Sequence, residues 1–330
     1  MIQTPLHENY DHLTPDLVID AVEAKGFLSD LRIFPLNSYE NRVYQVGLEE
    51  QEPVIVKFYR PLRWSEEAII EEHRYAQQLA SLELPVVAPI AIEGTTLHYF
   101  NGYRYAIFHR QGGQAPEPDD FDQLLWLGRL LGRMHQASGP TLFQSRPTMS
   151  VQRMIDEPAD YLLTHDFIPN YLQETYQQLT EKFKTDFTAL FEQIQPQLLR
   201  CHGDCHIANI LWHRATGPWF VDYDDCQNAP AVQDLWMLLA GSRNEQVAQF
   251  SELLEGYEEF KAFDRRELQL IEPLRTMRMV YYAGWLARRW EDPAFPTSFP
   301  WFNTSSYWQS HIGSLQEQLL LLDDEPFRLY

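Results

Sequence analysis

One stretch of the sequence constrains the fold of this chain more than any other. Residues 202–209 read His-Gly-Asp-Cys-His-Ile-Ala-Asn, and residues 220–224 read Phe-Val-Asp-Tyr-Asp. Between them, residues 209–212 and 219–222 have the apolar and aromatic composition of strands, and residues 214–218, which include Gly217, supply a turn. The stretch therefore predicts a β-hairpin whose open end carries polar side chains.

The predicted hairpin brings an amide and a carboxylate together. In an antiparallel pair, facing residues have a constant sum of sequence positions. A turn centred near Thr216 places Asn209 opposite Asp222, within two residues. Amide and carboxylate oxygens are hard ligands that suit Mg²⁺ better than zinc. We expect a metal site here, and the alternative is a pair of ordinary turn or capping residues.

Asp204, on the loop just before the first strand, completes a set of three groups. Phosphoryl transfer from a metal-bound nucleotide needs one carboxylate that accepts or orients the proton of the attacking hydroxyl. It also needs an amide oxygen and a second carboxylate that hold the metal against the phosphates. We predict Asp204 and Asp222 as catalytic residues and Asn209 and Asp222 as ligands of Mg²⁺.

The first third of the chain predicts an antiparallel sheet with one inserted helix. A helix begins after the capping residue Thr14 and ends before Gly26. Residues 31–36, 42–48, 54–59, 86–91, 95–100 and 103–108 are rich in β-branched and aromatic residues, and Asn101-Gly102 is a hairpin turn. A further helix is expected from Ser65 to about Ala80.

Helical periodicity dominates after residues 110–118, which read as a flexible connector. Helices are predicted at 121–136, 171–193, 232–240, 246–260 and 267–290. The chain is therefore expected to be an α+β protein with two lobes. Residues 1–109 form the predicted nucleotide-binding lobe, residues 110–330 the catalytic and substrate lobe, and ligands favour a cleft between such lobes.

Lys57 stands inside the apolar strand 54–58, where an ammonium group needs an anionic partner. The following helix offers Glu71 and Glu72. Because successive helical residues turn by about 100°, Glu72 falls on the face of Ile69 and Ala76, and Glu71 points toward solvent. A Lys57–Glu72 pair would aim the ammonium at ATP phosphates. The alternative is a strand-edge lysine and a solvated glutamate.

Two further segments are candidates for contact with ATP. Residues 37–41 join the first two strands at the place of a nucleotide-covering turn, and Ser38 or the backbone amides there could reach phosphate. The turn has no glycine, so an ordinary polar turn is the alternative reading. Phe108 ends the strand before the connector, where an adenine ring would meet backbone groups and apolar side chains.

Other motifs are weaker. Cys201, Cys205 and nearby histidines lack the spacing of a haem or zinc site, and we predict small buried thiols. A P-loop motif is absent from the sequence. We read Asp234, at a helix start, as a structural anchor of the loop that carries Asp204, and His135 as a core histidine. Asp224 and Asp225 are read as solvated turn residues, with metal or substrate contact as the alternative.

Composition limits the partners and the compartment. The formal net charge is −21, which argues against nucleic acid and anionic membrane as partners. The sequence has no apolar run near the ~20 residues that a membrane span needs. The first five residues do not read as a signal peptide. The three cysteines have no framework spacing, so a reducing, cytoplasmic location is expected.

The motif at 202–209, with the Asp-rich strand after it, resembles the aminoglycoside phosphotransferase and choline kinase branch of the protein-kinase-like fold. Residues 37–44, 56–61, 201–206, 230–239 and 292–296 are also similar to bacterial stress response kinases, a group of serine/threonine protein kinases. The resemblance covers nearly the whole chain. It implies a proton acceptor at Asp204, Mg²⁺ on Asn209 and Asp222, ATP phosphates on Lys57, and Ser38 at the nucleotide turn.

The expected function is therefore transfer of phosphate from ATP, with Mg²⁺, to serine or threonine hydroxyls of proteins, among them the kinase itself. We expect a monomer acting in a stress response. Two alternatives stay open. One is a small-molecule kinase for an aminoglycoside-, choline- or homoserine-like alcohol, and the other is a nucleotide-binding pseudokinase that acts through partner contact.

Overall fold

The computed structural model describes residues 6–323, 327 and 329, so the five residues examined for a signal peptide lie outside it. The described residues form two compact units. The β unit comprises those up to Gln123 with Phe143–Arg146 and Asp204–Cys226. The helical unit comprises Leu124–Leu142, Pro147–Gly203 and the residues from Gln227 onward. The functional division into lobes 1–109 and 110–330 remains a prediction.

The β unit is built on a five-stranded sheet in the order β1-β2-β3-β5-β4, with every neighbouring pair antiparallel. The strands are β1 (Ser29–Pro35), β2 (Arg42–Leu48), β3 (Gln51–Phe58), β4 (His98–Phe100) and β5 (Tyr103–His109). Lys57 pairs with Val43 on one side and Ala106 on the other, so it lies in the middle of the sheet.

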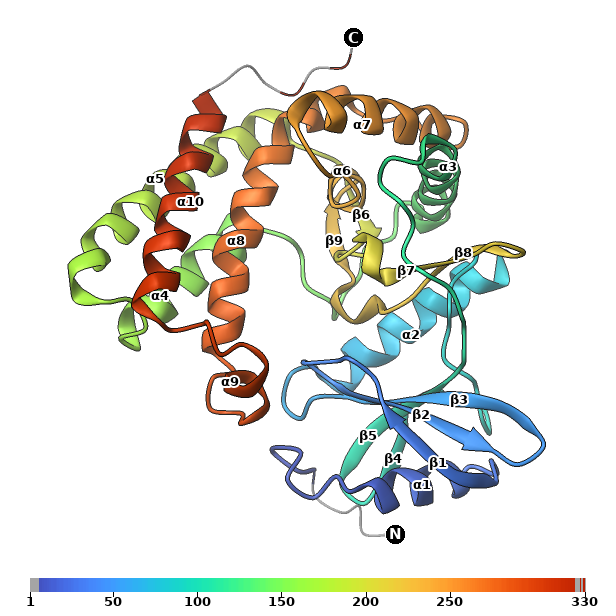
Figure 1. Cartoon of the computed structure of the whole chain (residues 1–330). Helices are drawn as coiled ribbons and strands as arrows, with labels where there is room; N and C mark the ends of the chain where they lie inside the picture. The colour runs from blue at the N-terminus through green and yellow to red at the C-terminus, as the bar shows by residue number, and fades with distance from the viewer. Residues whose placement is uncertain (1–5, 324–326, 328, 330) are drawn as a thin grey trace. The chain divides into compact units, whose positions relative to one another are not determined.

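Helices cover both faces of this sheet (Figure 1). Along β5, Tyr103, Tyr105 and Ile107 pack with α1 (Pro15–Glu23), and the alternate residues Ala106 and Phe108 pack on the side of α2 (Glu66–Ser81). This is the period of two expected for a strand buried on both faces. β5 is accordingly buried along most of its length, Arg104 included, and exposed polar residues do not alternate with buried ones.

The starts of both helices follow the sequence signals. The Thr14 and Ser65 side chains accept hydrogen bonds from the Leu17 and Ala68 amides, at 3.3 and 3.2 Å, as N-cap residues do. The predicted turn between β4 and β5 is also confirmed. Asn101 and Gly102 both have positive φ, 43° and 81°, as two-residue hairpin turns require.

The predicted strand at 86–91 is wrong. This segment makes two isolated bridges, Val86 with Phe220 and Pro89 with Phe108. Pro85 and Pro89 have no amide hydrogen to donate, so a continuous ladder cannot form there. The segment instead connects the predicted hairpin around residue 216 to the rest of the β unit, because the Val87 amide donates to the Phe220 carbonyl at 3.0 Å.

The elements of the helical unit are mostly helices. They are α3 (Phe121–Ser138), the π-helix η1 (Gln152–Asp156), α4 (Glu157–Thr164), α5 (Asn170–Ile194), β6 (Leu198–Cys201), β9 (Gln227–Pro230), α6 (Val232–Trp236), α7 (Arg243–Glu258), the 3₁₀ helix η4 (Arg265–Leu270), α8 (Ile271–Ala287), α9 (Ala294–Ser298) and α10 (Ser305–Asp323). α10 packs beside α5 and α8 (Figure 1). The predicted α+β class is confirmed.

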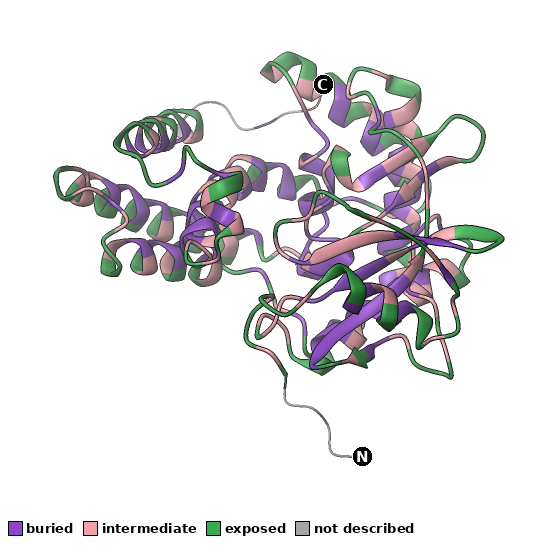
Figure 2. Cartoon of the chain, turned by 60° about the horizontal axis from the view of Figure 1, so that its bottom comes forward, coloured by how far each residue is buried: buried purple, intermediate pink, exposed green. Residues whose placement is uncertain are grey.

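The helices of this unit are amphipathic, and in Figure 2 they carry buried and exposed residues on different sides. Several helix boundaries differ from the sequence prediction, two of them by a turn or more. The helix predicted at 232–240 ends at Trp236, and the one predicted at 267–290 begins as a 3₁₀ turn before α8. Pro273 is the third residue of α8, where its missing amide hydrogen costs no helical bond.

Helices α3 and α7 approach each other closely. A side chain at Gly128 would overlap the Leu253 carbonyl, and one at Gly256 would overlap the Leu125 carbonyl. These glycines allow backbone-to-backbone contact between the two helices. Among the helices of residues 6–323, none is both long and apolar enough to span a membrane.

Candidate active site

The hairpin predicted around residue 216 exists, with a register one position away from the prediction. β7 (Ile210–His213) pairs with β8 (Gly217–Phe220), and Ile210 faces Phe220. The turn is therefore centred on residue 215. In this register Asn209 lies opposite Val221, whose amide donates to the Asn209 carbonyl at 3.0 Å. Asp222 follows directly. The observed register lies within the margin of two residues given with the prediction that Asn209 faces Asp222.

Asp222, two residues after β8 ends, has an unusual backbone conformation. Its φ and ψ are 61° and 64°, in the left-handed region, and the 3₁₀ turn η3 (Tyr223–Asp225) follows it. Its side chain is 55% exposed, and Oδ1 lies 3.0 Å from Lys57 Nζ. The turn therefore presents this carboxylate away from the strand.

Asp204 and Asn209 are joined by a local hydrogen bond. The Asn209 Nδ2 donates to the Asp204 carbonyl at 2.9 Å, across the 3₁₀ turn η2 (Ile207–Asn209). The amide nitrogen is thus used, which leaves the amide oxygen as the atom that can bind a cation. The Asp204 carboxylate is 24% exposed and lies 3.3 Å from His206 Nε2.

Lys57 is buried and lies among three carboxylates. Its Nζ is 3.0 Å from Asp222, 3.3 Å from Asp224 and 3.8 Å from Glu72. Burial by itself lowers the pKa of Lys57, but the three carboxylates outweigh it and hold the pKa well above its usual value. The lysine is therefore a fixed cation at neutral pH.

The Lys57–Glu72 pair predicted from the helix periodicity is present. Burial raises the pKa of Glu72 to about 7, with Asp224 adding to the rise and Lys57 opposing it. The prediction that Glu71 points to solvent is wrong. Its carboxylate accepts hydrogen bonds from the amides of Gln144, Ser145 and Arg146 at 2.7, 2.7 and 2.8 Å, and so holds that segment against α2.

The β unit contains a cavity of about 340 Å³, and most of the predicted site residues line it. This volume is within the range of small-molecule sites. The predicted site residues that line it are Ser38, Lys57, Glu72, Phe108, Asn209 and Asp222. Its walls also include apolar side chains of Leu36, Val43, Ile55, Ala76, Val87 and Leu211. Asp204 is not among the described lining residues.

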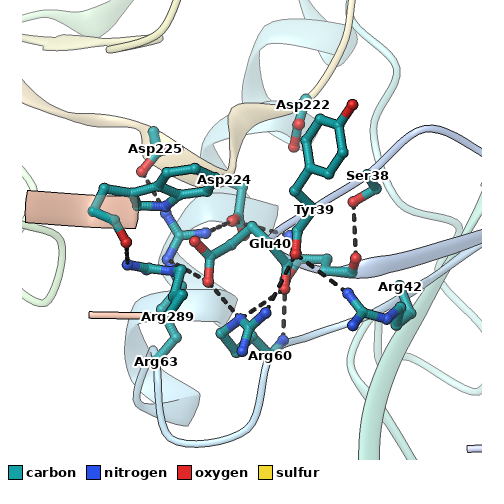
Figure 3. Close-up of polar contacts among 12 residues, drawn as sticks. Ser38, Tyr39, Glu40, Arg42, Arg60, Arg63, Asp222, Asp224, Asp225 and Arg289 are labelled. Carbon is teal, nitrogen blue, oxygen red and sulfur yellow. Dashed lines mark hydrogen bonds and ion pairs between the residues drawn. The ribbon is translucent and has the colours of Figure 1, made fainter. Parts of the chain in front are cut away.

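The prediction of solvated turn residues is wrong for Asp224, whereas Asp225 lies in the turn η3 with its side chain 39% exposed. The Asp224 carboxylate is 4% exposed and pairs with Arg63, Lys57 and Asn41. Burial alone would raise its pKa, but Arg63 and Lys57 outweigh burial and hold it well below its usual value. Asp225 Oδ1 lies 2.5 Å from Arg63 Nη2 (Figure 3). Arg63, a basic residue shortly after the strand that carries Lys57, was the sequence feature that could have indicated a partner for these carboxylates.

The segment around Ser38 is a loop between β1 and β2, as predicted. The Ser38 hydroxyl donates to the Asn41 carbonyl at 2.9 Å, which closes the turn on itself. Arg60 Nε donates to the Glu40 carbonyl at 2.9 Å. The turn is thus held by side chains, in a stretch where the sequence provides no glycine (Figure 3).

Asp234 has the anchoring contacts expected of it, all within the helical unit. Its carboxylate accepts from the His202 and Gly203 amides at 2.7 and 2.9 Å and lies 3.1 Å from His135 Nε2. The Tyr257 hydroxyl is 2.9 Å from His135 Nδ1.

The cysteines Cys201, Cys205 and Cys226 are buried and outside any disulfide, as predicted. The group His135, Cys201 and Asp234 is compact enough for a metal, but each carboxylate oxygen of Asp234 already accepts a backbone amide hydrogen bond.

Residues 32–271 match the family described as "Phosphotransferase enzyme family". The chain is 45% identical over 320 residues to "Stress response kinase A" of Escherichia coli (strain K12), with 97% of each chain covered. It is 44% identical over 328 residues to "Serine/threonine protein kinase RdoA" of Salmonella typhimurium, again with 97% of each covered.

Solved structures share the fold at low sequence identity. An amicoumacin kinase in complex with AMP-PNP, Ca²⁺ and its ligand aligns with a TM-score of 0.71 at 17% identity, covering 96% of this chain and 95% of that one. The choline kinase LicA from Streptococcus pneumoniae aligns with a TM-score of 0.65 at 12% identity, covering 93% and 98%. The kinase-like fold expected from the sequence is confirmed.

Proposed function

Because the chain belongs to the phosphotransferase enzyme family, we propose that it transfers the γ-phosphoryl group of ATP, with Mg²⁺, to serine or threonine hydroxyls of proteins. The observation that carries the proposal is the cavity in the β unit, where Lys57, Asn209 and Asp222 line one space. The two bacterial relatives support the acceptor, because one is named a stress response kinase and the other a serine/threonine protein kinase.

The metal fits the residues present. Asn209 has its amide nitrogen in a hydrogen bond and its oxygen available, and Asp222 is a half-exposed carboxylate that lines the same cavity. An amide oxygen and a carboxylate form a hard donor set that suits Mg²⁺. Asn209 and Asp222 would hold the ion. When bound, Mg²⁺ neutralises charge that develops on the transferring phosphates.

The side chains of this chain have distinct roles in the proposed reaction. Lys57 neutralises and orients the ATP phosphates, and Glu72 supports it from α2. Ser38 lies at the turn over the phosphates, and Phe108 borders the adenine site. The acceptor oxygen forms a bond to the γ-phosphorus while the bond from that phosphorus to the bridging oxygen breaks. ADP leaves with that oxygen, and Asp204 accepts the proton of the hydroxyl.

The test is phosphate transfer from γ-labelled ATP with Mg²⁺ and a generic protein acceptor. The proposal expects label on the acceptor or on the kinase itself. Asp204→Ala should abolish transfer and retain ATP affinity, because Asp204 acts on the acceptor hydroxyl. A chain that acts as a pseudokinase would show no difference between wild type and this variant. Absence of label on any protein, with small alcohols labelled instead, overturns the protein acceptor.

A small-molecule alcohol is the second candidate acceptor. The net charge of −21 favours cationic compounds such as choline-like or aminoglycoside-like alcohols over anionic ones. A panel of such alcohols in a coupled ADP-release assay separates the two candidates. Turnover that rises with one alcohol and not with protein would assign the small-molecule reaction.

We propose a cytoplasmic location and a monomeric enzyme with no nucleic-acid or membrane partner. The buried thiols of Cys201, Cys205 and Cys226 form no disulfide, which supports a reducing compartment. Size-exclusion chromatography with light scattering tests the monomer. Fractionation of cells into cytoplasm, periplasm and membrane tests the location.

A further inference from the structure

Asp222 and Asp224 are two residues apart and have opposite surroundings. The Asp222 side chain is 55% exposed and lines the cavity, whereas the Asp224 side chain is 4% exposed and is not among the described lining residues. The two carboxylates therefore cannot have the same task. Asp222 can meet a ligand directly, and Asp224 can act only through the protein groups that it contacts.

The oxygens of Asp224 are committed to three partners from separate segments. Oδ2 accepts from Asn41 Nδ2 at 3.0 Å and from the Arg63 guanidinium, and Oδ1 lies 3.3 Å from Lys57 Nζ. Lys57 belongs to β3, Asn41 ends the turn between β1 and β2, and Arg63 follows β3. One buried carboxylate thus ties the lysine to the turn.

The backbone of Asp224 is fixed as well. The Arg146 guanidinium donates to the Asp224 carbonyl and, at 3.0 Å, to the Cys226 carbonyl. Arg146 is buried, and its guanidinium carbon lies 4.0 Å from the centre of the Trp64 ring. Since both the main chain and the side chain are held, Asp224 is a rigid reference point for the groups around it.

Asn41 carries this restraint to the nucleotide turn. Its Oδ1 accepts from the Arg60 amide at 3.0 Å, and its carbonyl accepts from the Ser38 hydroxyl at 2.9 Å. Ser38 in turn lines the cavity. A turn without glycine and with side-chain restraints is preorganised, so a bound nucleotide has little ordering cost to overcome.

We propose that Asp224 is a positioning residue for nucleotide binding, which holds Lys57 and, through Asn41, the turn of residues 37–41 in one geometry. The inference rests on the proposed function. Asp224 restrains Lys57 more strongly than Glu72 does, because its carboxylate lies nearer to Lys57 Nζ, at 3.3 Å against 3.8 Å. It also joins Lys57 to the turn, which Glu72 does not contact in the described hydrogen bonds and ion pairs.

The test compares three isosteric variants by steady-state kinetics with ATP as the varied substrate. Asp224→Asn should raise the KM for ATP at least tenfold and lower kcat by a smaller factor. Glu72→Gln should raise the KM by less than Asp224→Asn does. Asp225→Asn is the matched control, because Asp225 shares the Arg63 partner and has no described contact with Lys57 or Asn41. It should stay within twofold of wild type.

A role in folding alone makes a different prediction. It would lower the unfolding midpoint and the active fraction and leave the KM of the folded protein unchanged. If Asp224→Asn does not fold, Asn41→Ala carries the test, because it removes one donor and leaves no unpaired charge in a buried site. It should raise the KM for ATP about threefold with little change in kcat. Where both variants fold, the double variant should be no worse than Asp224→Asn.

The outcomes separate this inference from the proposed function. An active wild type with an unchanged KM in both Asp224→Asn and Asn41→Ala overturns the positioning role alone. The same holds if Glu72→Gln raises the KM more than Asp224→Asn does. A wild type that neither binds AMP-PNP with Mg²⁺ in calorimetry nor uses ATP overturns the proposed function, and the positioning role with it.

Discussion

Replacing Asp234 by asparagine should destabilise the helical unit and slow turnover. The carboxylate accepts from two backbone amides, of His202 and Gly203, and lies 3.1 Å from His135 Nε2. Asparagine is isosteric with aspartate but has only one acceptor oxygen. Its NH₂ group would therefore face one of the two backbone amides, which also donates. At least one charge-assisted hydrogen bond is lost and one buried amide is left unpaired.

The size of this effect follows from those contacts. A hydrogen bond to a charged group contributes roughly 1.5–3 kcal/mol, and a buried donor left unpaired costs about 1–3 kcal/mol. We expect Asp234→Asn to lower the free energy of unfolding by about 3 kcal/mol. Because Gly203 is bonded to Asp204, movement of the anchored loop should also lower kcat, with a smaller change in the KM for ATP.

Urea unfolding followed by circular dichroism measures the loss. Asp186→Asn is the matched control, because Asp186 forms an exposed pair with Lys182 at 2.8 Å and such pairs contribute about 0–1 kcal/mol. The reasoning is refuted if Asp234→Asn is no less stable than Asp186→Asn.

The same variant has a signature in pH. Burial alone would raise the pKa of Asp234, but the hydrogen bond with His135 and the amide donors outweigh it and lower the pKa. A carboxyl whose pKa is lowered on folding stabilises the protein above its unfolded pKa of about 4, and that contribution is lost as pH falls through the folded pKa. The acid limb of the stability curve should therefore be flatter in Asp234→Asn.

Three further predictions concern stability. Glu71→Gln should cost about 2 kcal/mol, because the amides of Gln144, Ser145 and Arg146 lose a charged acceptor, and urea unfolding measures it. Burial lowers the pKa of His73 to about 3, so the unfolded chain binds a proton below about pH 6.5 that the folded one does not. Stability should fall with falling pH from there toward about pH 3, by at most ~1.4 kcal/mol per pH unit, and His73→Gln should remove this slope. Gly256→Ala should cost about 1–3 kcal/mol by overpacking against α3, measured in the same way.

Each of these three has a control in the chain. Glu174→Gln tests an exposed glutamate of α5, and His165→Gln an exposed histidine beyond α4. Gly313→Ala tests a helical glycine whose added Cβ would meet no atom within 4 Å. The packing and hydrogen-bond arguments fail if a variant and its control change stability equally, and the pH argument fails if His73→Gln leaves the acid slope unchanged.

Local patterns predicted the parts of the site that are close in sequence. Periodicity alone distinguished Glu72 from Glu71 as the partner of Lys57, because one face of α2 must be apolar to pack on the sheet. The hairpin was predictable from its turn residues. Its register was off by one because Gly217, assigned to the turn, pairs with His213 and so belongs to the ladder.

Groups whose surroundings come from distant segments were not predictable. Asp224 reads as a turn residue, and its burial depends on Arg63 and Arg146, which are about 160 and 80 positions away. Glu71 lies on the polar face of α2, and the segment Phe143–Arg146 crosses that face. In both cases the sequence correctly indicated a polar position, but contacts from distant segments replaced the solvent that was expected around the side chain.

The central claim is that Asn209 and Asp222 hold a divalent cation against ATP in the cavity of the β unit. A crystal structure of the chain with AMP-PNP and Mg²⁺ tests it directly. The account predicts Mg²⁺ at about 2.0–2.1 Å from Asn209 Oδ1 and from a carboxylate oxygen of Asp222, with the phosphates beside Lys57. A nucleotide bound elsewhere, or a magnesium ion that neither side chain contacts, would contradict it.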